Sequence, residues 1–414
     1  FNYNWDNTAS EIINSGYHTI IAGTTGSGKS TMLDTLLYNI CQCEPSFRNF
    51  DVIDLKRVSV MDWKNFPHCQ KYATTREQAE SVLADAIKLM NSIYHDMESK
   101  GLKESPYGFH YIIIDECHHA VANTYRQIID YFEPEFLLGL TATENRMDNQ
   151  DVVELFGNNI PYELRLRDAI INDLIVPFHY YGIRDELIDY GLSDSAERRL
   201  IAQIANEDNC NFIQQQIEKH RPNGQKLKAL AFCRNIQHAR MMADNMSEFY
   251  HTAYLTGQNN TGERIRAYND LQSDNKELEI LFAVDILNEG VDIPGVNMVL
   301  FLRPTESSTI FIQQLGRGLR KYANKSYVTI LDFIGNSYKR SVHIALALGS
   351  LSKGYILEKK LLKLMVREDF KLLGLEEYGV KINIDDLSKE EILQHIESEN
   401  FNQLRYLKKD YQNF

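Results

Sequence analysis

A glycine-rich stretch near the beginning of the sequence combines the residue types that bind a polyphosphate. Residues 23–30 are Gly-Thr-Thr-Gly-Ser-Gly-Lys-Ser, which matches the phosphate-loop pattern GxxxxGK[ST]. Glycines allow backbone N–H groups to point at phosphate oxygens, and the helix that follows offers the positive end of its dipole. We therefore expect ATP to bind here, with Lys29 at the β- and γ-phosphates and Ser30 holding Mg²⁺. The expected nucleotide-binding residues of this loop are Gly23, Thr24, Thr25, Gly26, Ser27, Gly28, Lys29, Ser30 and Thr31.

A pair of carboxylates follows a strongly apolar run. Residues 112–118 are Ile-Ile-Ile-Asp-Glu-Cys-His, so Asp115 and Glu116 stand at the end of a buried strand. Asp115 suits the Mg²⁺ shell, and Glu116 suits activation of the attacking water. His118 and His119 are weak candidates for a metal site, because adjacent side chains point in different directions and a third ligand is missing.

Two arginines are three residues apart in the second half of the chain. Residues 313–320 are Gln-Gln-Leu-Gly-Arg-Gly-Leu-Arg, and residues three apart on a helix point the same way. A guanidinium is planar, permanently charged and suited to a γ-phosphate. We expect Arg317 and Arg320 to act on the nucleotide as arginine fingers; a solvated basic helix face is the alternative.

Placing these side chains around one nucleotide requires strands that end beside them. Apolar runs alternate with helical periodicity, which predicts parallel sheets covered by helices. The expected strands of the first half are 17–23, 50–55, 109–115 and 136–142, with helices at 30–41 and 75–100. The expected strands of the second half are 227–232, 251–255, 278–284, 298–302 and 327–333, with helices at 263–272 and 308–315.

These elements predict an α/β protein with two domains built on parallel sheets, the first carrying the phosphate loop, and a mainly helical C-terminal region. We expect the domains at residues 1–157 and 158–335, followed by the helical extension at 336–414. In the extension, Ser388 and Glu391 form the pattern of a capping box for a helix beginning at Lys389.

Composition narrows the functional classes only slightly. The 414-residue chain has a net charge of −13, so nucleic acid binding would need local basic patches. Its six cysteines are scattered, which disfavours a zinc site or a disulfide framework. There is no apolar run long enough to span a bilayer and no signal-peptide pattern, so we expect a cytoplasmic protein without membrane contact.

Taken together, the motifs resemble those of superfamily 2 helicases of the DEAD/DEAH type. GTTGSGKS resembles motif I, DECH motif II, TAT at 141–143 motif III and ALAFCRN at 229–235 motif IV. AVDILNEGVDIP at 283–294 resembles motif V, and QQLGRGLRK at 313–321 resembles motif VI. The resemblance implies that both domains are RecA-like P-loop NTPase domains. It also implies a role for Gln313 in catalysis beside the two arginines, and for Gly290 and Asp292 in nucleotide binding.

The first hundred residues resemble a different group, the FtsK/SpoIIIE DNA translocases. This likeness rests on AGTTGSGKST, on DVIDLKRV at 51–58 and on the long helix that follows. It predicts a chimera joined near residues 108–116, which could keep the ATP site intact because both groups place these strands in one parallel sheet.

The sequence therefore predicts an ATP-driven helicase or translocase that acts on nucleic acid, with DNA favoured over RNA. ATP and Mg²⁺ would lie between the two domains of a monomer, and Thr256, Gly257 and the segment around Asn288 are candidate strand contacts. One alternative is a ring-forming pump for double-stranded DNA, as the FtsK likeness implies. The other is an ATP-dependent switch that binds nucleic acid without unwinding it, because the usual strand-gripping motifs are missing.

Overall fold

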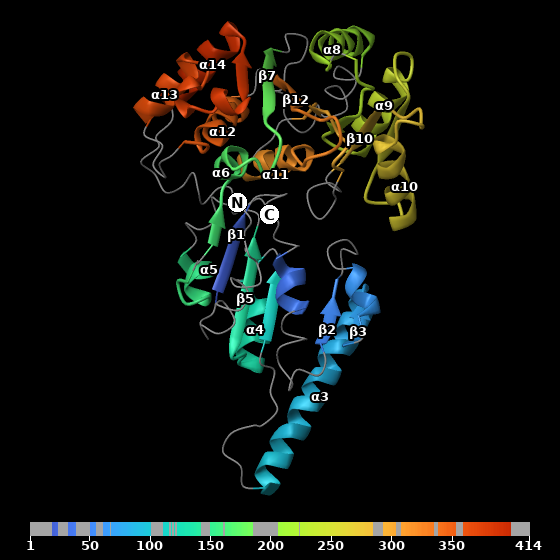
Figure 1. Ribbon diagram of the computed structural model, residues 1–414, viewed down its shortest axis with the longest axis vertical. Coiled ribbons are helices and arrows are strands. Elements are labelled where there is room, and N and C mark those ends of the chain that lie inside the picture. Colours follow the sequence, from blue (N-terminus) through green and yellow to red (C-terminus); the bar gives the residue numbers. More distant parts are fainter. Residues whose placement is uncertain are drawn as a thin grey trace. The chain divides into compact units, whose positions relative to one another are not determined.

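The computed structural model divides the chain into two compact units, Phe1–Leu164 and Arg165–Phe414 (Figure 1). The division falls after Leu164 rather than after residue 157, because the strand β6 (Tyr162–Leu164) pairs with β1 (Thr19–Gly23) of the first unit. The structure describes residues 19–23, 32–38, 50–54, 61–66, 68–100, 111–115, 117, 120, 122–141, 150–159, 162–184, 206–222, 224–284, 293–303, 308–334, 338–352 and 359–398.

The first unit contains a four-stranded parallel sheet in the order β4-β5-β1-β6. β4 (Tyr111–Asp115) and β5 (Phe136–Thr141) are two of the strands that the apolar runs predicted. β5 is buried along its whole length, as expected for a central parallel strand covered on both faces. Residues 32–38 are helical and bury Met32, Leu33 and Leu36, so the helix expected after the phosphate loop is present.

A second, two-stranded sheet stands apart from the first within the described residues of this unit. β2 (Phe50–Ile53) pairs in parallel with β3 (Cys69–Ala73), and the long helix α3 (Arg76–Lys100) lies beside both strands (Figure 1). Trp63 packs on Phe50 and Phe66, and its Nε1 donates to Asp34 Oδ1 at 2.8 Å. This contact joins the small sheet to helix 32–38.

The second unit is built on a seven-stranded parallel sheet in the order β13-β7-β12-β11-β8-β10-β9. The strands are β7 (Phe178–Arg184), β8 (Ala229–Phe232), β9 (Thr252–Leu255), β10 (Ile280–Ala283), β11 (Met298–Phe301), β12 (Val328–Ile334) and β13 (Lys381–Ile384). Crossovers in one direction along the sheet place α8 (Glu207–His220) and α9 (Ile236–Met246) on one face. The reverse direction places α10 (Thr261–Gln272) and α11 (Ser308–Gly318) together on the other face. The expected parallel α/β architecture is confirmed in both units.

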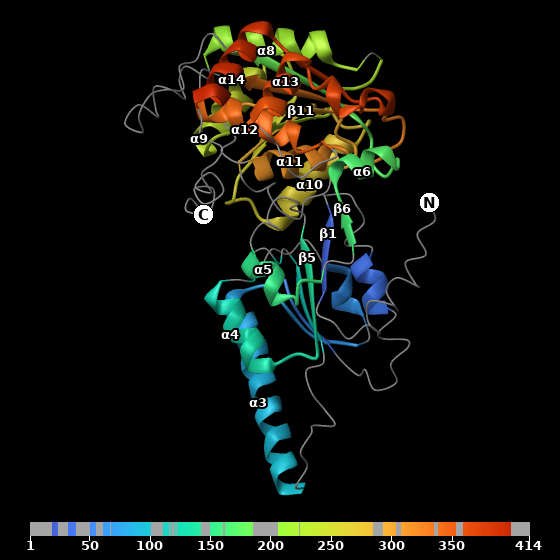
Figure 2. The same ribbon diagram turned by 90° about the vertical axis from the view of Figure 1, so that its left-hand side faces the viewer.

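The C-terminal region is part of this second unit and is not a separate helical appendage. α12 (Tyr338–Gly349), α13 (Lys359–Arg367) and α14 (Asp386–Ser398) pack on one another, and β13 extends the sheet beside β7 (Figure 2). Arg167 of α6 (Leu166–Ile171) is buried and donates from Nη1 to the carbonyls of Leu351 and Leu373, at 3.0 and 2.6 Å. The region is therefore tied to the segment that begins the unit.

The predicted capping box at Ser388 is wrong. The N–H of Ser388 donates to Asp385 Oδ1 at 2.9 Å, and its hydroxyl donates to the same carboxylate. α14 therefore begins at Asp386, with Asp385 in the capping position, and Ser388 is a buried residue of the first turn. None of the helices among the described residues is long and apolar enough to cross a membrane.

Candidate functional site

The carboxyl edge of the first unit's sheet brings together two of the predicted motifs. Ala22 of β1 is opposite Thr141 of β5, and Asp115 of β4 is opposite Leu140 of β5, so the three strands end level. Gly23, the first residue of the glycine-rich loop, is thus two strands from Asp115, roughly 10 Å at ordinary strand spacing. The side chain of Asp115 is exposed at this edge. The two motifs that were predicted to share a nucleotide therefore meet at one edge of one sheet.

Cys117 anchors the chain directly after the acidic pair. It is fully buried in a cluster with Ile114, Ile129 and Phe156. Gly139 of β5 makes this possible, because a Cβ at that position would lie 2.7 Å from both Cys117 Sγ and the Phe156 ring. The sequence reasoning treated Cys117 only as a scattered thiol, although a cysteine two residues beyond an acidic strand end is a candidate anchor.

Several predicted site residues lie outside the described residues. These are Thr24, Thr25, Gly26, Ser27, Gly28, Lys29, Ser30 and Thr31 of the loop, Glu116 of the acidic pair, and Gly290 and Asp292. Asn288, a candidate strand contact, also lies outside them. Gln313 lies on α11, but only its backbone is described.

The two predicted arginines lie at the end of α11. Arg317 belongs to the last turn of the helix and is only 5% exposed. Gly318 lets this turn approach the sheet, since a Cβ there would lie 3.1 Å from Val299 and 3.4 Å from Val328. Arg320 follows two residues later and is half-buried. Burial of Arg317 excludes the alternative in which this segment is a solvated basic face.

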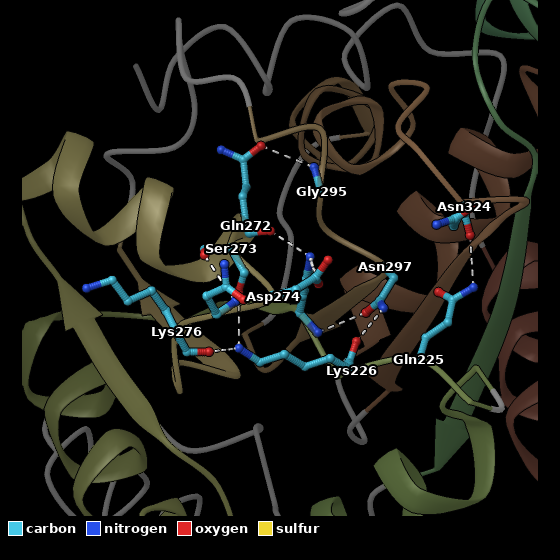
Figure 3. A network of polar contacts seen from close by, with 11 residues as sticks. Gln225, Lys226, Gln272, Ser273, Asp274, Lys276, Gly295, Asn297 and Asn324 are labelled. Atoms are coloured by element: carbon cyan, nitrogen blue, oxygen red, sulfur yellow. Dashed lines mark hydrogen bonds and ion pairs between the residues drawn. The ribbon is translucent and has the colours of Figure 1, made fainter.

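Lysine side chains hold the end of the neighbouring helix, α10. The Lys228 ammonium is buried and contacts the Gln272 carbonyl at 2.6 Å and Asp274 Oδ1 at 2.7 Å. Lys226 donates to the Ser273 carbonyl at 3.2 Å, and Asn297 links the two lysine backbones to the start of β11 (Figure 3). Carbonyls at a helix C-terminus lack partners within the helix, and positive charge there is favourable. These lysines therefore fix where α10 ends.

A third lysine holds the end of α11 in the same way. Lys325 donates to the Gly318 carbonyl at 2.8 Å and also to the Pro294 carbonyl. Sequence reasoning missed all three lysines, because a lysine at a strand or loop boundary has no spacing that distinguishes it from a solvated one. Together they set the position of α10 and α11, and hence of Arg317.

The Thr256–Gly257 turn, a predicted strand contact, is bound to α10. The N–H of Thr256 donates to Asn259 Oδ1 at 2.8 Å, and Thr256 itself is buried. Arg264 Nη2 donates to the Gly257 carbonyl at 2.9 Å. The helix begins with a capping box between Asn260 and Glu263, so the turn and the helix form one rigid piece.

Two buried side chains near the end of β8 are neutral at pH 7. Burial raises the pKa of the Cys233 thiol, although the Arg303 guanidinium acts to lower it. Burial, together with the charge of Arg234, lowers the pKa of His238 to about 4. His238 Nδ1 accepts from the Arg234 N–H at 3.1 Å, so this buried histidine of α9 holds the end of the segment resembling motif IV.

A cavity of about 530 Å³ in the second unit lies away from the predicted residues. Tyr181 and Ile183 of β7, Phe212 of α8 and Asn383 of β13 are among its lining residues. Tyr180, the neighbour of Tyr181, contacts Phe311 of α11, and successive strand residues face opposite sides of a sheet. The cavity is therefore on the face of the sheet opposite Arg317.

Comparison with family profiles gives two matches. Residues 3–146 match the family described as "Type III restriction enzyme, res subunit", and residues 208–322 match the "Helicase conserved C-terminal domain". The chain is 26% identical over 343 residues to the Saccharomyces cerevisiae protein assigned as the ATP-dependent helicase IRC3. That match covers 76% of this chain and 48% of the relative, so the chain spans about half the relative's length.

The profile match corrects one prediction. It runs from residue 3 to residue 146 without a break, so the expected join to an FtsK-like segment near residues 108–116 is wrong. A phosphate loop, a strand ending in lysine and a long helix occur in both classes of ATPase, and these features alone cannot separate them. The alternative function, a ring-forming pump for double-stranded DNA, rested on the FtsK likeness and is no longer supported.

Solved structures with a similar fold include subunits of restriction enzymes. A fragment of the HsdR subunit of a type I restriction enzyme from Vibrio vulnificus YJ016 aligns with a TM-score of 0.56 at 20% identity, over 80% of this chain and 62% of that one. The Type ISP restriction-modification enzyme LlaBIII bound to DNA aligns with a TM-score of 0.60 at 15% identity, over all of this chain and 34% of that one. At these identities the likeness shows the fold.

Proposed function

Because residues 3–146 match the restriction-enzyme res-subunit family and residues 208–322 match the helicase conserved C-terminal domain, we propose that the chain is an ATP-driven motor of superfamily 2 that moves along or unwinds DNA. The observation that carries the proposal is the level ending of β1, β5 and β4, which sets the start of the phosphate loop and Asp115 at one sheet edge. This arrangement suits a nucleoside triphosphate, because the backbone of the loop can bind the phosphates while the carboxylate binds the metal ion.

The residues of the first unit would bind the nucleotide and its metal ion. Lys29 contacts the β- and γ-phosphates, and Glu116 orients the attacking water. The donor set of Ser30 and Asp115, a hydroxyl and an exposed carboxylate, fits Mg²⁺, which prefers oxygen ligands. When bound, Mg²⁺ would neutralise charge that develops on the phosphates.

The second unit would supply the opposite wall of the site. Arg317 and Arg320 stabilise the charge on the transferred phosphoryl group, with Gln313, Gly290 and Asp292 beside the nucleotide. The nucleic acid strand is held mainly through its phosphates, partly at Thr256 and Gly257. DNA is proposed over RNA because a relative from Sulfurisphaera tokodaii, 26% identical over 278 residues, is named a DNA 3'-5' translocase. Each cycle of closure on ATP and opening after hydrolysis would advance a monomer along the strand.

Lys29→Ala and Arg317→Ala test the proposal in one ATPase experiment. Rates are measured with single-stranded DNA, duplex DNA and RNA, and binding of ATP is measured separately. We expect Lys29→Ala to abolish stimulated hydrolysis, and Arg317→Ala to retain ATP binding while slowing turnover by about 10³-fold.

An unchanged rate in Lys29→Ala would overturn the nucleotide assignment. If Arg317→Ala weakened DNA binding and left turnover intact, the arginine would belong to the strand interface instead. Stronger stimulation by RNA than by either form of DNA would replace the proposed substrate.

A further inference from the structure

Arg264 and Tyr268 are one helical turn apart on the same side of α10. α10 and α11 lie on the same face of the sheet, and residues at i and i+4 of a helix are neighbours on its surface. Arg264 is half-buried and Tyr268 is 8% exposed. Arg317 of α11 is buried near them, because Gln272, one turn after Tyr268, accepts from the Gly295 N–H at 3.3 Å, and Gly318, next to Arg317, faces Val296. Two guanidiniums and one phenol therefore share one region between two helices.

The hydroxyl of Tyr268 is buried and has no hydrogen-bond partner among the described residues. A buried hydroxyl without a partner is destabilising relative to an apolar group of the same shape. Phenylalanine would fill the same space without that cost. Packing therefore gives no reason for the oxygen atom.

The neighbours of this hydroxyl explain what the oxygen can do. Burial raises the pKa of Tyr268 to about 12, while the positive charges of Arg264 and Arg317 act to lower it. Both guanidiniums are thus near the phenol, and a guanidinium only donates hydrogen bonds. Of the three side chains, the phenol oxygen is the one that can accept.

We propose that Tyr268 is a positioning residue for Arg317. Its phenol oxygen accepts an N–H from the Arg317 guanidinium when that group meets the terminal phosphate, which leaves the other N–H groups directed at the phosphate. This role rests on the proposed function of Arg317 and deepens it, since it states how a residue outside the recognised motifs sets the direction of the finger.

Arg264 extends the same arrangement to the predicted strand contact. Its Nη2 atom donates to the Gly257 carbonyl at 2.9 Å, and its positive charge acts on Tyr268, one turn further along the helix. If the Thr256–Gly257 turn shifts when nucleic acid binds, Arg264 would carry that shift along α10 to Tyr268 and so change the position of Arg317. This provides a short physical connection between strand binding and turnover.

The test is the DNA-stimulated ATPase of the full chain with Tyr268→Phe, which removes one oxygen atom. We expect kcat to fall about tenfold, the KM for ATP to change less than about twofold, and the melting temperature to stay the same or rise. In an Arg317→Ala background the same substitution should cause no further loss, because the tyrosine acts through that arginine.

Two matched controls separate positioning from folding. Tyr250 also has a half-buried hydroxyl, which donates to Glu218 at 2.8 Å, so Tyr250→Phe should lower the melting temperature and leave kcat unchanged. Arg266→Ala changes an exposed arginine of the same helix and should keep kcat within about twofold, whereas Arg264→Ala should lower it.

Three outcomes would overturn the inference. These are an unchanged kcat in Tyr268→Phe, an equal loss with and without Arg317, or a loss that follows the melting temperature. Different results would contradict the proposed function itself. These are a wild-type chain without nucleic-acid-stimulated ATPase activity, or a Lys29→Ala variant that keeps this activity.

Discussion

The position of Asp115 depends on one glycine in the neighbouring strand. Cys117 enters the space that a side chain at Gly139 would occupy, and the Phe156 ring closes that space from the other side. Asp115 is two residues before Cys117, so the depth to which the cysteine is buried sets where the carboxylate emerges.

Gly139→Ala should therefore disturb the site through packing alone. An added Cβ would lie 2.7 Å from Cys117 Sγ and from the Phe156 ring, and relief of such overpacking costs about 1–3 kcal/mol. We expect a lower urea midpoint and a lower kcat, with ATP binding retained. Gly257→Ala, where nothing lies within 4 Å of the new atom, is the matched control for stability. Equal stability of the two variants would show that the strand absorbs the extra methyl group.

Among the helices, α10 and α11 are defined by what caps their last turns. The last turn of each contacts lysine side chains that come just before a strand, Lys226 and Lys228 before β8 for α10 and Lys325 before β12 for α11. α11 carries Arg317, and α10 carries Tyr268, which we propose positions that arginine. The lysine contacts therefore restrict how far the two helices can shift against each other.

Lys228→Met keeps the apolar stem and removes the charge. The Gln272 carbonyl loses a charge-assisted hydrogen bond in a buried position, which should cost about 1–3 kcal/mol of the free energy of unfolding. Urea unfolding of the chain measures this. Lys276→Met is the control, because its ion pair with Asp270 is exposed and long at 3.9 Å and should contribute almost nothing. A loss as large in the control would contradict the capping role.

Sequence periodicity predicted the elements whose apolar residues follow a clear pattern. β5 and β10 are buried along their whole length and were found where expected, as was α3, whose apolar residues recur at helical spacing. β13 was missed, because Lys-Ile-Asn-Ile alternates as an edge strand does and sits between helical segments. The cap of α14 was misplaced by three residues, since Asp385 and Ser388 are both good capping residues and only the fold decides between them.

The candidate site divides in the same way. Gly23, Asp115, Arg317 and Arg320 belong to short motifs. In these motifs the residue types and their spacing match what phosphate or metal binding requires, so the sequence alone was enough to propose them. Tyr268 and Lys228 act through neighbours that are distant in sequence, and no local pattern marks them. The FtsK likeness was wrong for a related reason: it rested on elements that many P-loop ATPases share.

Across the second unit, the C-terminal region supports the sheet and the segment that starts it. Removal of everything after Ser352 would strip β13 from β7 and remove α13 and α14 from α12. It would also take the Leu373 carbonyl from Arg167, leaving the Leu351 carbonyl as the remaining one of the two that its buried Nη1 contacts.

We therefore expect a chain ending at Ser352 to lose its cooperative unfolding transition in the second unit. Leu362, Val366, Ile392 and Ile396 are fully buried, and burying each such side chain is worth about 1.5–3 kcal/mol. Their sum is comparable to the 5–15 kcal/mol that stabilises a typical domain, so the truncated unit should aggregate or unfold at a much lower temperature. Arg167→Met in the full-length chain is the milder companion, and it should lower the melting temperature without abolishing the transition. Calorimetry distinguishes the results, because an independent appendage would leave the main transition of the truncated chain sharp and at its original temperature.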